Sequence, residues 1–331
     1  MHSHQPRRIG QTPIVAAGAA DGYEAIFNAG VVFHDGRYHL FARGVRAGYR
    51  RNPGDGPRFL DYISDILLFS STDGVDYDFE RILALSAPDG VACFEDPRVQ
   101  LVTSGNEAHW VMTYTNLPAP GSGQPWRIGA HRLSYTEAGF ELDESSMTLL
   151  GPRGIANKDA VLFNLSDGRV AMIHRIHPDM QLAVFDTLDH LWEAPDQYWD
   201  DHVRELDSHV IIALTPGSLG VGAGAPPIAT DDGLLLFFHE RNADGVYTMK
   251  VALLDEETGR VRAMLDEPIF WPELVWERVG DVDNVVFVQG AHRGPDGMIY
   301  LTYGAADRAV GAAKVSEAAV LDELLSVECA A

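Results

Sequence analysis

The chain has 331 residues, 46% of them hydrophobic, which is enough for a large core. Its 25 basic and 48 acidic residues give a formal net charge of −23, which argues against a nucleic-acid partner because phosphates attract Lys and Arg. No stretch approaches the roughly 20 apolar residues of a membrane helix, and residues 1–11 lack the apolar segment of a secretory signal, so we expect a cytoplasmic protein without a membrane partner.

Short strand-like runs, bounded by Gly, Asp, Asn or Pro, follow an expected N-terminal arm at about residues 1–12. One unit recurs among them, a turn that ends in glycine followed by a hydrophobic strand. Its copies in chain order are HDGRYHLFAR (34–43), SGNEAHWVMTY (104–114), SDGRVAMIHR (166–175), DDGLLLFFHE (231–240) and PDGMIYLTYG (295–304). The turn glycines, Gly36, Gly105, Gly168, Gly233 and Gly297, recur about every 65 residues, as in propellers and similar arrays.

The repeat predicts a single all-β domain over residues 1–331, a five-bladed β-propeller. Each blade would contain four antiparallel strands around a central channel. Asp-Gly between hydrophobic runs favours tight hairpins, because glycine adopts positive φ without steric cost. Helix signals are few: Ser316 is a candidate cap for a helix over about 316–326, and residues 196–206 form a second candidate.

Polar residues recur at equivalent places in this repeat. The strand before the turn carries Asn28, Glu95 and Asp96, Lys158 and Asp159, and Asn284, and the strand after it reaches Arg43, Arg175 and Glu240. Equivalent positions of different blades meet at one end of a propeller, where they would line a polar pocket if that end faces the axis. Buried charges require partners or a ligand, and a cluster of carboxylates and basic groups is what glycoside cleavage requires.

Several motifs together resemble glycoside hydrolase family 130, in order from Asn28 to about Val315. They are FEDPRV, NKDAVLF with MIHRIHP, GAGAPPI with FFHE, ERVGDVDNVVF, and YGAAD with VGAA. The resemblance implies a five-bladed propeller that acts on β-mannosides with inversion and without a cofactor. Some members of the family are phosphorylases, which use inorganic phosphate as co-substrate, and others are hydrolases.

The resemblance also implies residue roles. Asp96 corresponds to the general acid, which in the phosphorylases is thought to deliver its proton through a sugar hydroxyl. The expected mannosyl-binding residues are Asn28, Arg43, Asp65, Asp159 and Asp307. The expected phosphate or polar subsite consists of Lys158, Arg175, His239 and Tyr247.

Two departures from the phosphorylase pattern favour hydrolysis. Ala229 stands where the phosphorylases usually have lysine, and Glu240 stands where they usually have glycine. A lost cation and a gained anion both weaken a phosphate site. Glu240 and Glu277 then become the candidates for the two catalytic glutamates of the hydrolases. The sequence therefore favours an inverting hydrolase that releases mannose from the non-reducing end of β-1,2- or β-1,4-linked manno-oligosaccharides.

Other interpretations stay open at this point. Lys158 and Arg175 keep a mannoside phosphorylase as the first alternative, and a non-catalytic carbohydrate-binding propeller is the second. The candidate charges also have structural interpretations, as ion pairs between blades or on the surface. No metal site is predicted, and the oligomeric state and the linkage are left open. Loops around residues 46–62 and 116–127 are expected to shape the leaving-group side of the site.

Overall fold

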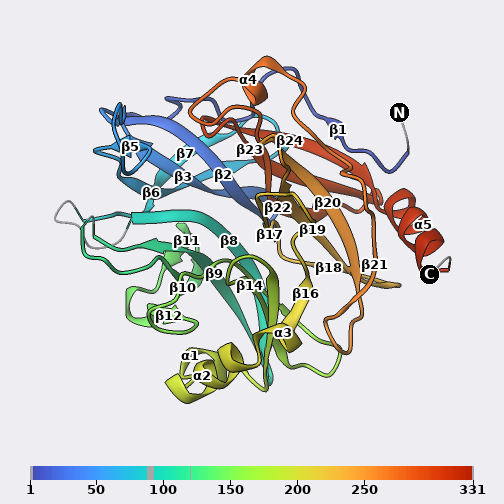
Figure 1. Cartoon of the computed structure of the whole chain (residues 1–331). Coiled ribbons are helices and arrows are strands. Elements are labelled where there is room, and N and C mark those ends of the chain that lie inside the picture. Colours follow the sequence, from blue (N-terminus) through green and yellow to red (C-terminus); the bar gives the residue numbers. More distant parts are fainter. Residues whose placement is uncertain (1–2, 88–92, 120, 330–331) are drawn as a thin grey trace.

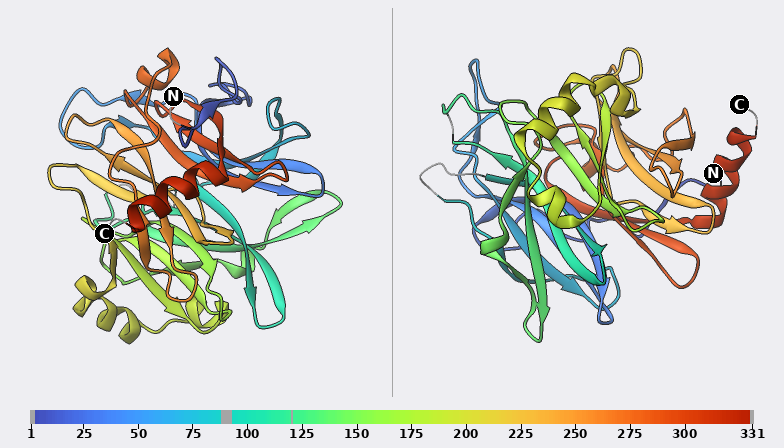
Figure 2. Two further views of the ribbon diagram at one scale, coloured as in Figure 1. Left: turned by 90° about the vertical axis from the view of Figure 1, so that its right-hand side faces the viewer. Right: turned by 90° about the horizontal axis from the view of Figure 1, so that it is seen from below.

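The computed structural model describes residues 3–87, 93–119 and 121–329, so Met1 and His2 of the expected arm lie outside the described residues. Five small antiparallel sheets stand in a ring (Figures 1 and 2), which confirms the predicted five-bladed β-propeller. Neighbouring sheets contact one another around the ring. In the described part of the chain, no helix is long and apolar enough to cross a membrane.

The first two blades are four-stranded sheets with additions. Blade 1 contains β2 (Tyr23–His34), β3 (Arg37–Arg46), β6 (Ser64–Ser71) and β7 (Asp78–Ala84), and its β3–β6 loop carries the small hairpin β4 (Arg50–Arg51) and β5 (Phe59–Leu60). Blade 2 contains β8 (Cys93–Ser104), β9 (Glu107–Leu117), β10 (Arg127–Thr136) and β11 (Gly139–Leu142). The short helix η1 (Glu144–Ser146) leads into β12 (Thr148–Leu150), which also pairs with β10.

The next two blades follow the same plan. Blade 3 contains β13 (Lys158–Asn164), β14 (Val170–Arg175), β15 (Met180–Phe185) and β16 (Val210–Ile212). Its last connection holds α1 (Leu188–Trp192), α2 (Asp196–Arg204) and α3 (Leu206–His209). Blade 4 contains β17 (Gly220–Ala223), β19 (Gly233–Arg241), β20 (Tyr247–Leu254) and β21 (Val261–Met264), with β18 (Ile228–Thr230) also paired to β19.

Blade 5 joins the two ends of the chain. Its strands are β22 (Val286–Arg293), β23 (Met298–Ala305), β24 (Ala309–Ser316) and, at its outer edge, β1 (Arg7–Arg8) from the N-terminal arm. The turn α4 (Val275–Arg278) precedes β22, and α5 (Glu317–Glu328) follows β24 with the Ser316 hydroxyl accepting a hydrogen bond from the N–H of Ala319. The N-terminal strand therefore closes the ring from the opposite end of the sequence.

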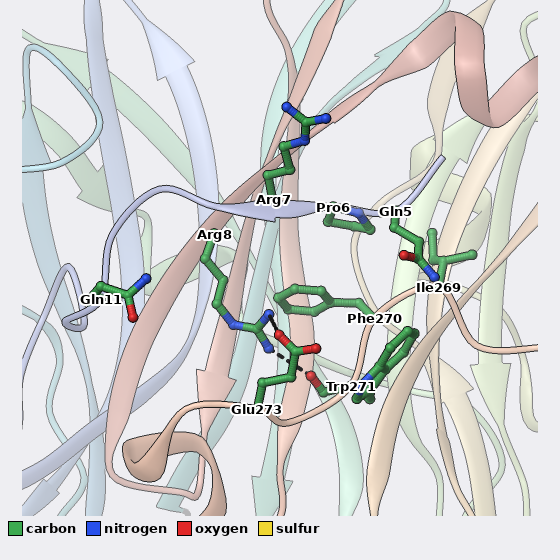
Figure 3. Close-up of a pocket in the computed structure, with 9 residues that line it drawn as sticks. All are labelled: Gln5, Pro6, Arg7, Arg8, Gln11, Ile269, Phe270, Trp271 and Glu273. Carbon is green, nitrogen blue, oxygen red and sulfur yellow. Dashed lines mark hydrogen bonds and ion pairs between the residues drawn. The ribbon is translucent and has the colours of Figure 1, made fainter. Parts of the chain in front are cut away.

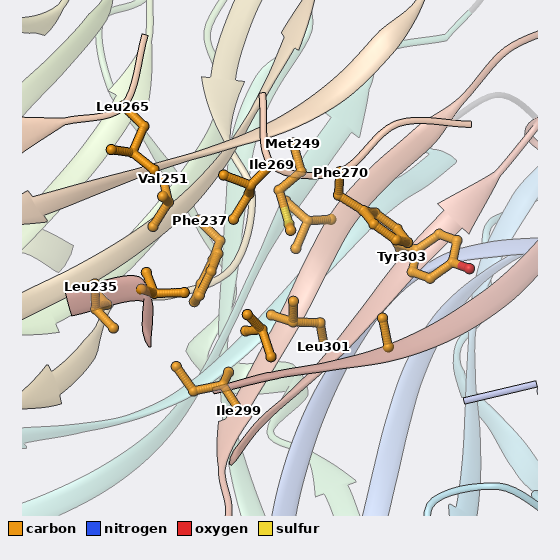
Figure 4. Close-up of a cluster of buried hydrophobic side chains, with 14 of the residues drawn as sticks. Leu235, Phe237, Met249, Val251, Leu265, Ile269, Phe270, Ile299, Leu301 and Tyr303 are labelled. Carbon is orange, nitrogen blue, oxygen red and sulfur yellow. The ribbon is translucent and has the colours of Figure 1, made fainter. Parts of the chain in front are cut away.

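The five turn glycines of the repeat all have positive φ, between 62° and 137°. Each lies at or just before the start of the second long strand of its blade, as Gly36 lies between β2 and β3. The hydrophobic strands after these turns are buried between neighbouring blades. Figure 4 shows one such cluster, in which side chains of β19 and β20 pack against Ile299, Leu301 and Tyr303 of β23. The core thus consists of inter-blade layers, and the polar positions lie at one end of them.

Candidate active site

Irregular backbone at the starts of three inner strands presents the recurring polar residues. β2, β8 and β13 each shift register, beside Asn28, Asp96 and Asp159 respectively. These three residues have φ of 46°, 53° and 57°, a left-handed conformation that Asn and Asp tolerate better than most residues. A bulge re-aims the side chain that it carries. The repeated Asn or Asp positions are therefore the points at which the sheets direct polar groups toward the axis.

Asp96 lies at the centre of a buried hydrogen-bond network. Its Oδ1 accepts a hydrogen bond from Asn28 Nδ2 at 2.7 Å and one from Arg43 Nη1 at 3.2 Å. Arg43 also pairs with Glu95 and donates to the Tyr62 hydroxyl at 2.9 Å. Only 5% of Asp96 is exposed. Asn28 and Arg43 of blade 1 thus hold Oδ1 of Asp96, a residue of blade 2, in a fixed position.

The pKa values of the surrounding groups reflect this burial. Burial raises the pKa of Glu95 above its ordinary value, although Arg43 opposes the effect. Burial alone would lower the pKa of Arg43, but Glu95, Tyr62 and Asp96 hold it above the ordinary value. Arg43 is therefore a permanent cation that fixes a group of acids.

Asp307 is the second acid of this region and lies in the turn between β23 and β24, with φ of 53°. Burial raises its pKa to about 7, against the opposing effect of Arg43. A carboxyl group in this range is partly protonated near neutral pH, and its neutral form can donate a hydrogen bond to a hydroxyl oxygen. Asp96 and Asp307 thus provide two carboxyl groups from different blades.

A cavity of about 120 Å³ opens between these groups. Its lining is Asn28, Arg43, Arg58, Glu95, Asp96, Lys158, Arg241, Tyr247, Val282, Val285, Phe287 and Asp307. Six residues with a role expected from the sequence meet here, together with Glu95 of the recurring polar positions: Asn28, Arg43, Asp96, Lys158, Tyr247 and Asp307. The cavity therefore combines carboxyl groups, cations and two aromatic rings.

The cations of the cavity are unequally neutralised. Arg43 is ion-paired with Glu95 and Asp96. By contrast, among the described residues no carboxylate forms an ion pair with Lys158, Arg58 or Arg241. Positive charge without a carboxylate partner in a recessed site favours an anionic ligand.

Below the cavity, Asp159 is enclosed by basic groups. Arg175, which lies opposite Lys158 on β14, approaches Asp159 Oδ2 to 3.1 Å, and His239 Nε2 lies 3.7 Å from the same oxygen. Burial would raise the pKa of Asp159, but Arg175, Lys158, His239 and Arg98 hold it far below the ordinary range. Burial lowers the pKa of His239 to about 3. Asp159, Arg175 and His239 therefore form a supporting layer and do not line the cavity.

Arg98 is a residue of this layer that the sequence analysis did not select. It is fully buried and donates to the carbonyl oxygens of Ala223 at 2.7 Å and Gly224 at 2.8 Å. It also reaches Asp159 Oδ1 at 3.3 Å. The available signal was its place two residues after Asp96 in FEDPRV. Arg58 and Arg241 are further lining residues that the sequence analysis did not select, whereas Glu95 was among its recurring polar positions.

The structure does not bring Glu240 into the cavity. On β19, His239 faces Asp159 and Arg241 lines the cavity. Because side chains alternate along a strand, Glu240 between them points to the opposite face. Its carboxylate accepts hydrogen bonds from Thr215 Oγ1 at 2.6 Å and Ser218 Oγ at 2.9 Å, and Lys250 Nζ lies 3.6 Å away. Its observed contacts are structural.

Glu277 also lies outside the cavity. Arg8 of β1 donates to both of its oxygens, at 2.7 and 2.8 Å, and the Tyr303 hydroxyl donates at 2.8 Å. The N–H groups of Glu273 and Leu274 complete its shell. Burial would raise the pKa of Glu277, but these donors hold it below the ordinary value. This carboxylate anchors the N-terminal strand to the α4 turn.

Asp65, expected to bind sugar, is likewise held elsewhere. It accepts hydrogen bonds from Tyr23 Oη at 2.7 Å, from Arg46 at 2.7 and 2.9 Å and from the N–H of Ser86 at 2.7 Å. It is fully buried and does not line the cavity. Its contacts connect β6 with β3 and with the segment after β7.

The position of Ala229 removes a second argument against phosphate. Ala229 pairs with Leu234, whereas Gly222 pairs with His239 on the same strand. Five residues of extended strand span about 16 Å. A lysine at position 229 would therefore lie too far along β19 for its ammonium group to belong to the cluster of cavity cations.

A larger groove, of about 470 Å³, lies beside β1 (Figure 3). Figure 3 shows Arg8 between Phe270 and Glu273, and Arg8 Nη1 bonds to Glu273 Oε2 at 2.8 Å. The groove contains none of the recurring polar residues, so we assign the chemistry to the smaller axial cavity. In the described ranges, no group of three or more His, Cys, Asp or Glu residues is arranged to hold a metal ion.

Fold and site together define a five-bladed propeller with an acid-bearing cavity on its axis. Residues 9–325 match the model of a family described as beta-1,4-mannooligosaccharide phosphorylase. The chain belongs to this family, glycoside hydrolase family 130, as its motifs indicated.

Curated relatives and a solved structure agree with this assignment. A 1,2-beta-oligomannan phosphorylase from Thermoanaerobacter sp. (strain X514) is 30% identical, with 93% of this chain and 96% of the relative covered. A beta-1,4-mannooligosaccharide phosphorylase from Ruminococcus albus is 32% identical, with 96% and 90% covered. The structure of beta-1,2-mannobiose phosphorylase from Listeria innocua superposes with a TM-score of 0.71 at 19% identity, covering 97% of this chain and 99% of that one, and this likeness supports the fold.

Proposed function

We propose that the protein is a β-mannoside phosphorylase, which cleaves a terminal β-mannosyl unit with inorganic phosphate. The observation that carries the proposal is that, among the described residues, three cavity cations beside Asp96 form no ion pair with a carboxylate: Lys158, Arg58 and Arg241. The similarity to named phosphorylases over nearly the whole chain supports it. This proposal replaces hydrolysis as the preferred activity, because the arguments for hydrolysis rested on Ala229 and Glu240, and neither residue lines the cavity.

In the proposed reaction, Asn28, Arg43 and Asp307 hold the mannosyl unit. Both donors to Asp96 use Oδ1, so Oδ2 remains to carry the proton. A phosphate oxygen attacks the anomeric carbon, the glycosidic bond breaks, and the electron pair passes to the leaving oxygen, which is protonated by Asp96, directly or through a sugar hydroxyl. Lys158, with Tyr247 nearby, binds the phosphate. One displacement inverts the configuration and gives α-mannose 1-phosphate and a shortened saccharide.

Product analysis on β-1,2- and β-1,4-linked manno-oligosaccharides tests the proposal. The purified protein is incubated with and without inorganic phosphate, and mannose 1-phosphate and free mannose are both quantified. Phosphate-dependent formation of mannose 1-phosphate is expected. Free mannose released at the same rate in phosphate-free buffer would identify a hydrolase, and the absence of turnover on every linkage would favour a carbohydrate-binding propeller.

A further inference from the structure

The loop between β9 and β10 brings an exposed aromatic side chain to the mouth of the cavity. β8 begins beside Asp96 and β9 returns to the same end of the blade, so residues 118–126, with residue 120 outside the described part, belong to the cavity end of the propeller. Trp126 closes this segment and is 44% exposed. A single exposed aromatic ring is ordinary on a protein surface, so what distinguishes this ring is where it lies relative to the cavity.

Contacts connect Trp126 directly to the site. Lys158 lines the cavity, and its Nζ lies 6.0 Å from the centre of the Trp126 ring. The backbone oxygen of Trp126 accepts a hydrogen bond from the N–H of Asn157 at 3.2 Å, which joins the loop to the start of β13. The ring is therefore attached to the strand that carries Lys158, while its own surface stays open.

The chemistry of a sugar chain matches this arrangement. The cavity, at about 120 Å³, is too small to enclose an oligosaccharide, so the units beyond the terminal sugar must leave through the mouth. Mannopyranose has an apolar face of C–H groups, and an indole ring offers a flat apolar surface at low cost in conformational entropy.

We infer that Trp126 is a stacking platform for the second leaving-group sugar of the oligosaccharide, outside the catalytic cavity, and that it favours longer chains over disaccharides. This inference rests on the proposed function for its substrate. It assigns a chain-length preference to one residue of the rim, whereas the cavity residues determine the reaction itself.

The test compares Trp126→Ala with Trp126→Phe and with the matched control Trp271→Ala. Trp271 is 38% exposed and lies in the groove beside β1, away from the cavity. Phosphorolysis of β-linked mannobiose and mannotriose is measured at saturating phosphate. We expect kcat/KM to fall about tenfold more for mannotriose than for mannobiose in Trp126→Ala, to recover substantially in Trp126→Phe, and to be unchanged in Trp271→Ala.

Equal losses on both saccharides, or no loss on either, would overturn the inference. A change confined to the KM for phosphate would also overturn it, because Trp126 would then act through Lys158. Binding of mannotriose, followed by calorimetry without phosphate, separates this inference from the proposed function. If the wild type binds mannotriose more tightly than Trp126→Ala but does not use phosphate, the proposed function fails and the platform stands.

Discussion

Single carboxyl groups in this propeller differ in role because their partners differ. Asp96 offers one oxygen to Asn28 and Arg43, and it lines the cavity. Glu277 has both oxygens bonded by Arg8 and by backbone N–H groups, and Glu240 is bonded by two hydroxyls. Neither glutamate lines the cavity, so neither can transfer a proton to a ligand bound there. These geometries separate the proposed acid from the structural acids.

Replacement of Asp96 by Asn should reduce kcat by about 10²–10⁴-fold, the usual contribution of a general acid. Glu240→Gln and Glu277→Gln are matched carboxylate-to-amide controls, and each should retain turnover within about tenfold of the wild type. Initial rates with saturating mannoside and phosphate give the comparison. If either control loses as much activity as Asp96→Asn, that glutamate belongs to the catalytic machinery and hydrolysis regains its basis.

Asp307 should make stability depend on pH. Its pKa in the folded protein, about 7, lies above the ordinary value of 3.8. The neutral acid therefore stabilises the fold fully below about pH 4, and this contribution is lost as the pH rises to about 7. Asp307→Asn cannot ionise, so its free energy of unfolding relative to wild type should rise by about 2–4 kcal/mol between pH 4 and pH 8.

Denaturant unfolding at both pH values measures this difference. Asp322→Asn, at an exposed position of α5, serves as the control and should show no such trend. A constant difference between Asp307→Asn and wild type would mean that Asp307 is ionised throughout this range.

At the scale of elements, Arg98 connects three blades near the axis. It starts on β8, reaches the carbonyl oxygens at the end of β17, and contacts Asp159 of β13. Burial lowers its pKa, although Asp159 and Asp96 oppose this effect. A guanidinium group suits this place because its planar fork can serve several acceptors at once.

Arg98→Met should lower the free energy of unfolding by about 3–5 kcal/mol, because it leaves carbonyl oxygens and part of Asp159 buried without a donor. Arg98→Lys should recover only part of this loss, since one ammonium cannot reach all the acceptors. Arg153→Met, whose side chain is 77% exposed in its pair with Asp196, is the matched control and should have little effect. Thermal and denaturant melts give the values, and a neutral Arg98→Met would show that Arg98 does not join the blades.

At the scale of the whole molecule, the ring depends on closure between the chain ends. β1 pairs with β24, with Arg8 opposite Ala313, and α5 continues from β24. Arg8 also binds Glu277, which adjoins the segment that reaches Val282 and Val285 of the cavity. The N-terminal strand therefore supports both the fifth blade and one wall of the site.

Removal of residues 1–8 should lower the melting temperature by several degrees, because Glu277 loses its cation partner and β24 loses its outer neighbour, together about 3 kcal/mol or more. Removal of residues 1–5 retains β1 and should cost much less. Calorimetry on the two truncated proteins compares them. If both melt like the full chain, β1 does not contribute to closure.

The sequence by itself determined the fold and the main positions of the candidate site. A hairpin turn with positive-φ glycine is a local property, so five copies at a constant interval were sufficient to predict five blades. Asn28, Asp96 and Asp159 were visible for the same reason, because each occupies an equivalent place in the repeat. The family resemblance added the expectation of a β-mannoside substrate. It also indicated Asp307, a residue that the repeat did not single out.

Only the tertiary structure decided which charged groups face the cavity. Glu240, Glu277 and Asp65 are acids of the same kind as Asp96, and their neighbours in sequence do not show that hydroxyls, arginines and N–H groups from distant segments satisfy them. Trp126 became significant only through Lys158, on the next blade. The physical reason is that strand alternation and turns are set by adjacent residues, whereas burial, pairing and pKa depend on contacts between blades.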